Sequence, residues 1–234
     1  MSVFIANLSK FISRFNSAFV VTIEISVFSL IFATIIGIIV GVINTSKGKS
    51  IPIKILKAIG NIYIFIIRGT PMMVQILIIY FGIAQALRPL IGFSWHSIGG
   101  TTTAGIVVCS LNAGAYMSEI VRGGIEAVDH GQIEAARSLG LTNTQTMTSI
   151  VLPQALRTMM PSIINQFIIT IKDTSLLSVI GLPEITNVGK TLASTWSSQT
   201  LLLYCTMAVY YLIMCSILAQ VSKYVEKRMS YGRR

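Results

Sequence analysis

Long apolar stretches separated by short polar ones run along the whole chain. Five of them approach or exceed the roughly 20 residues that an α-helix needs to cross the hydrocarbon core of a bilayer. They cover residues 18–43, 59–86, 100–121, 155–173 and 199–222. The pattern predicts an all-α membrane protein whose five transmembrane helices share one packed interior.

The composition agrees with this pattern. Of the 234 residues, 53% are hydrophobic and 11% are charged, whereas a soluble domain has roughly 25% charged residues. The net charge of +10 does not indicate a nucleic-acid partner, because the basic residues are not clustered with aromatic ones in a soluble fold. The cysteines and histidines have no metal-ligand spacing, so we expect no nucleic acid and no metal.

Basic residues predict the orientation. The loop after the first stretch and the tail after the last carry nine of them: Lys47, Lys49, Lys54, Lys57, Lys223, Lys227, Arg228, Arg233 and Arg234. By the positive-inside rule both segments are cytoplasmic. Five crossings then place the N-terminus outside the cell and the C-terminus in the cytoplasm. The polar segment 174–198 is broken by Gly181 and Pro183, and we expect it to form one or two short outer helices.

Residues 1–17 form an amphipathic N-terminal segment. Phe11 and Phe15 fall on one helical face, and Lys10 and Arg14 fall on the opposite face. The segment is therefore predicted to lie on the membrane surface, and a frayed terminus is the alternative.

Gly37 and Gly41, in the first stretch, have GxxxG spacing. Such a pair lets two helix backbones approach closely. We expect this contact within the chain, and a contact between two copies is the alternative.

A polar stretch between the third and fourth spans predicts two short cytoplasmic helices. The first starts at a capping box on Asp129 and ends at Gly140. The second starts at a capping box on Thr142 and ends at Leu152, because Pro153 interrupts the hydrogen-bond ladder. The small residues Ala135 and Ala136 in the first helix allow another protein to approach. On local physics alone, a plain helical hairpin between spans is the alternative.

The same stretch resembles a known motif. Glu134, Ala135, Ala136, Gly140 and residues 150–153 are similar to the EAA loop of ABC importer permeases, the family of binding-protein-dependent transport components. In that family the EAA helix is a coupling helix that sits in a cleft of a separate ATPase subunit. The resemblance thus assigns Glu134, Ala135, Ala136 and Gly140 to ATPase coupling.

Other segments resemble the polar amino acid subfamily in particular. They are Arg68–Pro71 followed by Met72–Gln75, Ala115–Glu119, Arg122–Ile125, Gly131–Gln132 and Lys172–Leu176. Together the motifs cover roughly residues 20–220. They argue against an osmolyte permease, a close relative that would also carry the EAA loop.

The resemblance implies an architecture and a set of partners. It implies a type I ABC importer permease with a transmembrane domain over residues 18–223, an EAA coupling loop at 126–153 and a basic tail at 224–234. The partners would be cytoplasmic ATP-binding ABC subunits, an extracellular solute-binding protein and a second permease copy, identical or paralogous. The protein would be a multi-pass component of a bacterial plasma membrane.

The chain itself is not expected to hydrolyse ATP. Gly48, Lys49 and Ser50 resemble the end of a Walker A loop, but Ile43 stands where the first glycine is needed. ATP and Mg²⁺ would therefore be used by the partner ATPase, and no cofactor would be bound by this chain. An ion-coupled transporter is the less favoured alternative, since no inverted repeat or pair of broken helices is apparent. A membrane-embedded enzyme would need a converging set of reactive groups, and the sequence shows only scattered charges.

Polar residues within apolar stretches indicate where an amino acid binds, because a polar group inside a membrane needs a partner or water. The candidate substrate-binding residues are Met72, Gln75, Asn165, Gln166, Asp173 and Ser175, with Ser162 on the same face of the fourth span. Asp173 would pair with the substrate ammonium and the amides would hydrogen-bond its other groups. Two alternatives remain: the stripe only joins helices, or Asp173 lies near the outer mouth as a gate.

Three further expectations concern charge. Relatives that handle basic amino acids tend to present an acid where Gln166 stands, so the resemblance favours a neutral polar substrate such as glutamine or cystine, with basic amino acids as the alternative. Glu119 is three residues before Arg122, which predicts a local ion pair. We assign Arg68 a structural or gating role.

Overall fold

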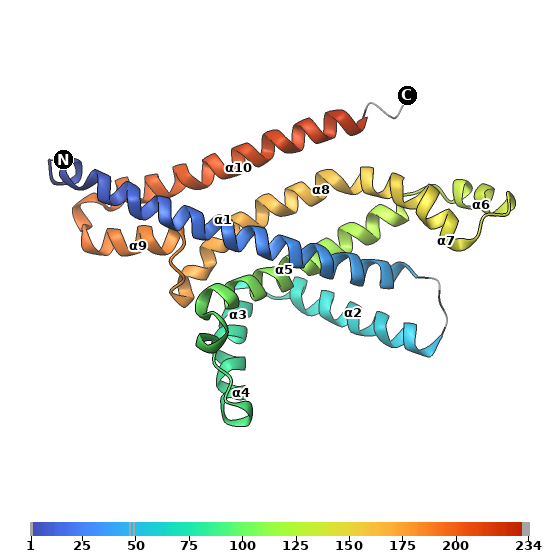
Figure 1. The fold of residues 1–234 in the computed structure, drawn as a ribbon, viewed down its shortest axis with the longest axis horizontal. Helices are drawn as coiled ribbons and strands as arrows, with labels where there is room; N and C mark the ends of the chain where they lie inside the picture. Colours follow the sequence, from blue (N-terminus) through green and yellow to red (C-terminus); the bar gives the residue numbers. More distant parts are fainter. Residues whose placement is uncertain (1, 47, 49, 231–234) are drawn as a thin grey trace.

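The protein is composed of helices joined by short connections. The computed structural model describes residues 2–46, 48 and 50–230 (Figure 1). Lys47, Lys49, Arg233 and Arg234, which contributed to the predicted orientation, lie outside the described residues. No strand occurs in the part of the chain that is described, so the predicted all-α class is confirmed.

Ten α-helices and five shorter helical segments make up the described chain. The α-helices are α1 (Ser2–Thr45), α2 (Ile51–Gly69), α3 (Met72–Leu77), α4 (Ala84–Ile91), α5 (Gly100–Glu126), α6 (His130–Ser138), α7 (Asn143–Thr146), α8 (Leu152–Asp173), α9 (Ile185–Thr195) and α10 (Thr200–Ser230). The π-helical segments are Ile78–Ile83 and Met147–Val151, and the 3-10 segments are Trp95–Ile98, Thr174–Ile180 and Ser197–Gln199.

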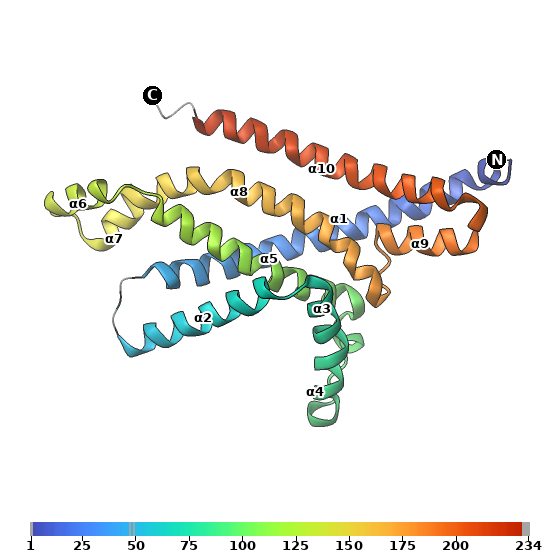
Figure 2. The ribbon, with the colours of Figure 1, turned by 180° about the vertical axis from the view of Figure 1, so that it is seen from behind.

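Five helical segments of the described chain are long and apolar enough to cross a membrane, as predicted. They are Ser9–Thr45, Met72–Ile91, Gly100–Glu126, Asn143–Ile180 and Ser197–Arg228. The end of α1, the start of α2, the helices α6 and α7, and the end of α10 lie toward one end of the molecule, and α9 lies at the other (Figures 1 and 2).

Helix α1 is a single helix of 44 residues, so the N-terminal segment 1–17 continues into the first span without a break from Ser2. Its apolar face contacts protein. Phe11 meets Trp196 edge-on, with ring centroids 5.7 Å apart, and Phe15 stacks on Tyr210 at 5.4 Å. The location of this segment on the membrane surface stays a prediction.

The predicted second span, residues 59–86, is wrong as one continuous helix. The chain leaves helical geometry at Thr70 and Pro71, whose backbones are extended (ψ 146° and 137°). Proline lacks an N–H and disfavours helical geometry in the residue before it, so the helix ends there. Helix α2 runs beside α1 and α5, whereas α3 and α4 turn sharply away from this axis (Figures 1 and 2).

The predicted interruption at Pro153 is also wrong. Helical structure is continuous from Asn143 through the π-helical segment Met147–Val151 into α8. Pro153 falls in the first turn of α8, and the wider π-helical turn before it accommodates a residue that cannot donate a hydrogen bond. The predicted second cytoplasmic helix is therefore the first part of the fourth span.

Helix α5 lies at the centre, and α1 packs closely along it. A Cβ on Gly37 would lie 2.5 Å from Cγ of Met117, and one on Gly41 would lie 2.8 Å from the carbonyl oxygen of Ser118. The glycine pair therefore packs within the chain, as expected. Only glycine permits this separation, because either added methyl group would overlap α5.

Candidate functional site

The loop between α5 and α8 forms a compact corner built by two helix caps. Asp129 caps α6 by accepting a hydrogen bond from the N–H of Gly131 at 2.8 Å. Thr142 and Gln145 form the predicted capping box, with bonds of 2.8 and 3.3 Å. Gly140 has φ +84°, a conformation that side-chain-bearing residues rarely adopt. The two caps and this glycine fix the turn between α6 and α7.

Helix α6 is attached firmly to the ends of two spans. Ala136 is buried, and Ile133 packs against a cluster that includes Ile125 of α5 and Val151 at the start of the fourth span. The side chain of Gln154 donates to that of Gln132 at 2.6 Å, so Gln132 does not complete a capping box with Asp129. A force on α6 is therefore transmitted directly to α5 and α8.

The outward face of this corner is exposed. It contains Glu134, Ala135 and Gly140, together with Leu139, whose exposed fraction is 82%. Of the four residues predicted for coupling, only Ala136 faces the interior. Sequence reasoning did not single out Leu139. The feature of the sequence that could have identified Leu139 is a large apolar residue directly before a glycine that ends a helix.

A polar cavity of about 620 Å³ opens between four helices. Its lining residues are Arg68 of α2, Tyr116, Glu119 and Ile120 of α5, Pro161, Ser162, Asn165 and Gln166 of α8, and Ser222 and Glu226 of α10. The structure thus brings the predicted polar residues Ser162, Asn165 and Gln166 onto one wall. This volume lies within the roughly 300–1,000 Å³ typical of small-molecule sites.

Arg68 and Glu119 of the lining belong to an ion-pair network. Glu119 accepts from Nε of Arg122 at 2.9 Å and from NH1 of Arg68 at 3.0 Å. Arg122 also reaches Glu126 at 2.6 Å. The local pair of Glu119 with Arg122 was predicted, whereas the contact from Arg68 depends on how α2 packs beside α5.

Gln75 and Met72 serve the fold in this structure. The side-chain nitrogen of Gln75 donates to the carbonyl oxygens of Ile67 and Thr70 at 2.7 and 3.0 Å, and its side-chain oxygen accepts from Asn112 at 2.9 Å. These bonds bridge the interruption between α2 and α3. Met72 packs beside a buried apolar cluster, and neither residue lines the polar cavity.

Asp173 and Ser175 also lie apart from this cavity. Asp173 is the last residue of α8, seven positions after Gln166, which is roughly 10 Å along a helix axis. The hydroxyl of Ser175 donates to the carbonyl oxygen of Lys172 at 2.7 Å. The predicted substrate-binding set is thus divided into a cavity group and an outer group.

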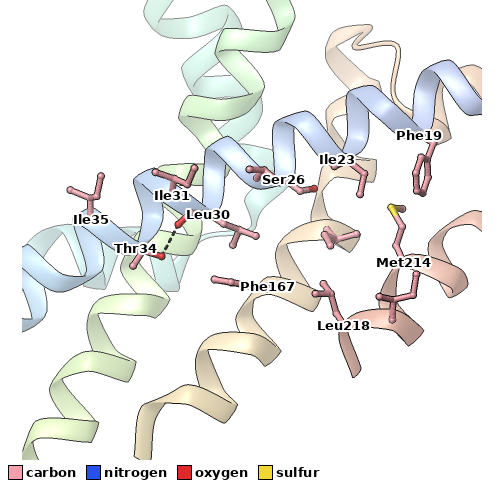
Figure 3. A pocket seen from close by; sticks show the side chains of 13 residues that line it. Phe19, Ile23, Ser26, Leu30, Ile31, Thr34, Ile35, Phe167, Met214 and Leu218 are labelled. Atoms are coloured by element: carbon pink, nitrogen blue, oxygen red, sulfur yellow. Dashed lines mark hydrogen bonds between the residues drawn. The ribbon is translucent and has the colours of Figure 1, made fainter. Parts of the chain in front are cut away.

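A second cavity, of about 630 Å³, is apolar. It lies between α1, α8 and α10, where Phe19, Phe167 and Met214 are among its lining residues (Figure 3). Its only hydroxyls, on Ser26 and Thr34, donate to carbonyl oxygens four residues earlier in α1, both at 2.7 Å. With no charged residue in its lining, this cavity offers no partner for an ammonium or a carboxylate.

Glu184 is a buried acid that sequence reasoning missed. Its carboxylate accepts from the N–H groups of Thr186 and Asn187, both at 2.7 Å, and from the hydroxyl of Tyr211 at 2.8 Å. Burial raises the pKa of this carboxyl above its usual value, although the three hydrogen bonds oppose the rise. The residue caps α9 and joins it to α10; its signal was an acid directly before the first turn of a helix.

Comparison with known proteins places the chain among transport components. Residues 33–231 match the family described as binding-protein-dependent transport system inner membrane component. The chain is 37% identical over 171 residues to the glutamine transport system permease protein GlnP of Escherichia coli K12, covering 73% of this chain and 74% of GlnP. It is 36% identical over 172 residues to the arginine transport system permease protein ArtQ of Bacillus subtilis 168, with 73% and 74% covered.

A solved structure agrees with these relatives. The crystal structure of an amino acid ABC transporter with histidines superposes on the chain with a TM-score of 0.83 at 30% identity. The match covers 95% of this chain and 97% of the other.

Proposed function

This chain belongs to the family of binding-protein-dependent transport system inner membrane components and is a permease subunit of an amino acid ABC importer, and we propose that it carries a neutral polar amino acid through the cavity lined by Asn165 and Gln166. The observation that carries the proposal is this cavity of about 620 Å³, which is lined by two amides, Asn165 and Gln166, and by the ion pair of Arg68 and Glu119. Amides donate to and accept from an uncharged polar side chain, and the charged wall suits the two ionised groups of an amino acid.

Overall identity does not decide the substrate. The glutamine and arginine permeases resemble the chain almost equally, at 37% and 36%. The lining residues therefore carry the argument, and the uncharged Gln166 favours glutamine or a similar neutral compound. Basic amino acids are the second candidate, because the exposed acid Glu226 also lines the cavity.

The exposed face of α6 is proposed as the docking site of a cytoplasmic ATPase. The permease is not itself the ATPase subunit, and ATP and Mg²⁺ are used by that partner. Leu139 offers a projecting apolar side chain, and Glu134 and Ala135 lie beside it. Because the segment after α7 continues into α8, closure of the ATPases moves the wall that carries Asn165 and Gln166.

The proposed function also implies an orientation in the membrane. The corner formed by α6 and α7 faces the cytoplasm, as does the basic end of α10. Helix α9 and the N-terminus are outside, where α9 lies near an extracellular solute-binding protein. Both cytoplasmic elements lie at one end of the molecule and α9 at the other (Figure 1), which supports this orientation. A second permease copy, identical or paralogous, completes the pore. The proposed domain limits are 18–223 for the transmembrane domain and 224–234 for the tail.

Uptake by the reconstituted importer tests the substrate. The tagged permease is purified with its co-purifying chains, placed in liposomes with its binding protein, and supplied with ATP inside and radiolabelled glutamine, cystine or arginine outside. We expect ATP-dependent uptake of glutamine or cystine, insensitive to ionophores. Preferential arginine uptake would support the basic alternative, and transport driven by an ion gradient without an ATPase would overturn the ABC mechanism.

A further inference from the structure

Arg68 presents unused hydrogen-bonding capacity to the polar cavity. It lies in the last turn of α2 and lines the cavity, with 43% of its side chain exposed. Among the described residues its side chain makes one hydrogen bond, from NH1 to Glu119 at 3.0 Å. A guanidinium has five N–H donors arranged as a planar fork, so most of these donors have no partner among the described residues.

Glu119 holds Arg68 in place while it uses few of its donors. Arg122 contacts both carboxylate oxygens of Glu119, at 2.9 and 3.0 Å, and also pairs with Glu126 at 2.6 Å. Arg68 adds a single hydrogen bond to this network. The guanidinium of Arg68 also lies over the ring of Tyr116, with Cζ 5.5 Å from the ring centroid. Both contacts orient the guanidinium, and its remaining N–H donors stay available to a ligand.

The backbone on either side of Arg68 is held as well. Gln75 donates to the carbonyl oxygens of Ile67 and Thr70, which flank this arginine in sequence. This arrangement keeps Arg68 at the interruption between α2 and α3. A cation positioned in this way is pre-organised, and pre-organisation lowers the entropic cost of binding.

We propose that Arg68 binds the α-carboxylate of the amino acid in the polar cavity, an inference that rests on the proposed function. Glu119, Tyr116 and Gln75 are then the residues that position Arg68. Arginine pairs with a carboxylate through two parallel hydrogen bonds. Asn165 and Gln166, which line the same cavity, then contact the substrate side chain. This assignment replaces the structural or gating role expected for Arg68 from sequence. Asp173 takes no part in it, because it does not line the cavity.

The experiment removes the same contact from the protein and from the ligand. The full importer complex in nanodiscs, without binding protein, is titrated with radiolabelled glutamine in equilibrium dialysis. Competition is measured with γ-aminobutyramide, which is glutamine without its carboxyl group. The variants are Arg68→Gln and Arg68→Lys, and the matched control is Arg157→Gln, an exposed arginine of α8 that does not line the cavity.

In the wild type we expect glutamine to bind about 10- to 100-fold more tightly than γ-aminobutyramide, the range for hydrogen bonds to a charged group. Arg68→Gln should remove most of this difference in affinity, because it should weaken the binding of glutamine and leave the binding of γ-aminobutyramide unchanged. Arg68→Lys keeps the charge without the fork and should restore part of it, which also covers the case in which Arg68→Gln fails to assemble. Arg157→Gln should match the wild type.

Equal weakening of both ligands by the Arg68 variants would show a structural role and overturn the assignment, as would unchanged binding of both. In either case the proposed function would survive, because the wild type still binds glutamine. If the wild-type complex binds neither glutamine nor cystine, the proposed neutral substrate and the role of Arg68 fall together.

Discussion

The side-chain amide of Asn112, on α5, donates a 2.9 Å hydrogen bond to the side-chain oxygen of Gln75, on α3. Both side chains are buried. The bond joins the central helix to the residue that bridges the interruption after α2. Two polar residues that are remote in sequence thereby stabilise the place where the second predicted span changes direction.

Replacing Gln75 with alanine should destabilise this interruption. The carbonyl oxygens of Ile67 and Thr70 would lose a donor, and the amide of Asn112 would lose its acceptor. A buried polar group without a partner costs about 1–3 kcal/mol. The measurement is the melting temperature in detergent, with Gln220→Ala, an exposed glutamine of α10, as the control. Equal melting temperatures for the two variants would contradict the bridging role.

Leu139→Ala should weaken ATPase binding about 10-fold or more, because a projecting apolar side chain is a typical anchor of an interface. Membrane insertion should be normal, since Leu139 is 82% exposed and contributes little to the fold. Binding is measured as recovery of the ATPase on the tagged permease. The control is Leu201→Ala at the opposite end of the molecule, where the exposed fraction is 79%. Undiminished recovery with Leu139→Ala would rule out a docking contact at this residue.

Gly140→Val should also reduce coupling, for a conformational reason. The positive φ of +84° at Gly140 is strained for a residue with a Cβ, so the turn between α6 and α7 would shift. We expect lower ATP-dependent uptake with normal amounts of permease in the membrane. The same substitution at Gly123, where a Cβ would meet no atom within 4 Å, is the control. Normal uptake with Gly140→Val would show that the exact turn does not matter.

Gln166→Glu should shift selectivity toward cationic amino acids. The side chain lines the polar cavity, and a carboxylate there would attract an ammonium or a guanidinium. The ratio of arginine to glutamine uptake should rise about 5- to 10-fold, as expected for roughly 1 kcal/mol of differential interaction. Gln166→Ala separates the effect of charge from that of losing the amide. An unchanged ratio in Gln166→Glu would remove the specificity argument.

Glu184 should make stability depend on pH. In the unfolded state this carboxyl has a pKa of about 4.3, and burial raises its pKa in the folded state. Between these two values the folded state keeps a proton that the unfolded state has released. The resulting stability is therefore present at low pH and is lost as the pH rises through this window.

The measurement is the melting temperature of the wild type and of Glu184→Gln from about pH 4 to about pH 8. The wild type should lose stability relative to the variant as the pH rises, because glutamine does not titrate. Parallel curves would contradict the raised pKa.

Much of the fold could be predicted from the sequence. The apolar stretches located five helical spans, because each must satisfy its own backbone in lipid. The spacing of Gly37 and Gly41 predicted a close helix contact, and local capping residues such as Thr142 and Gln145 located the ends of short helices. These features depend on residues near one another in the chain. The structure confirms the number of long apolar helical segments, the close contact at the glycine pair and the capping box of Thr142. The second predicted span, however, is interrupted at Thr70 and Pro71.

The predictions from sequence were wrong at two prolines, because the effect of each proline on its helix depends on the surrounding structure. Pro71 ends a helix and Pro153 does not. At Pro71, a buried glutamine supplies donors to the carbonyl groups beside the interruption. At Pro153, the π-helical turn over Met147–Val151 lets the helix continue. Neither accommodation can be read from the proline itself.

By itself, the sequence determined the class of fold, the five spans, the corner at α6 and the resemblance to importer permeases, because periodicity, charge asymmetry and motifs are local properties. Only the tertiary structure decided which polar residues meet. It brought Arg68, Glu119, Asn165 and Gln166 into the lining of one cavity. Gln75 instead supports the backbone, and Asp173 lies outside the cavity lining. The physical reason is that a cavity is formed by the faces of separate helices, whose relative rotation and spacing depend on side-chain packing across the whole bundle.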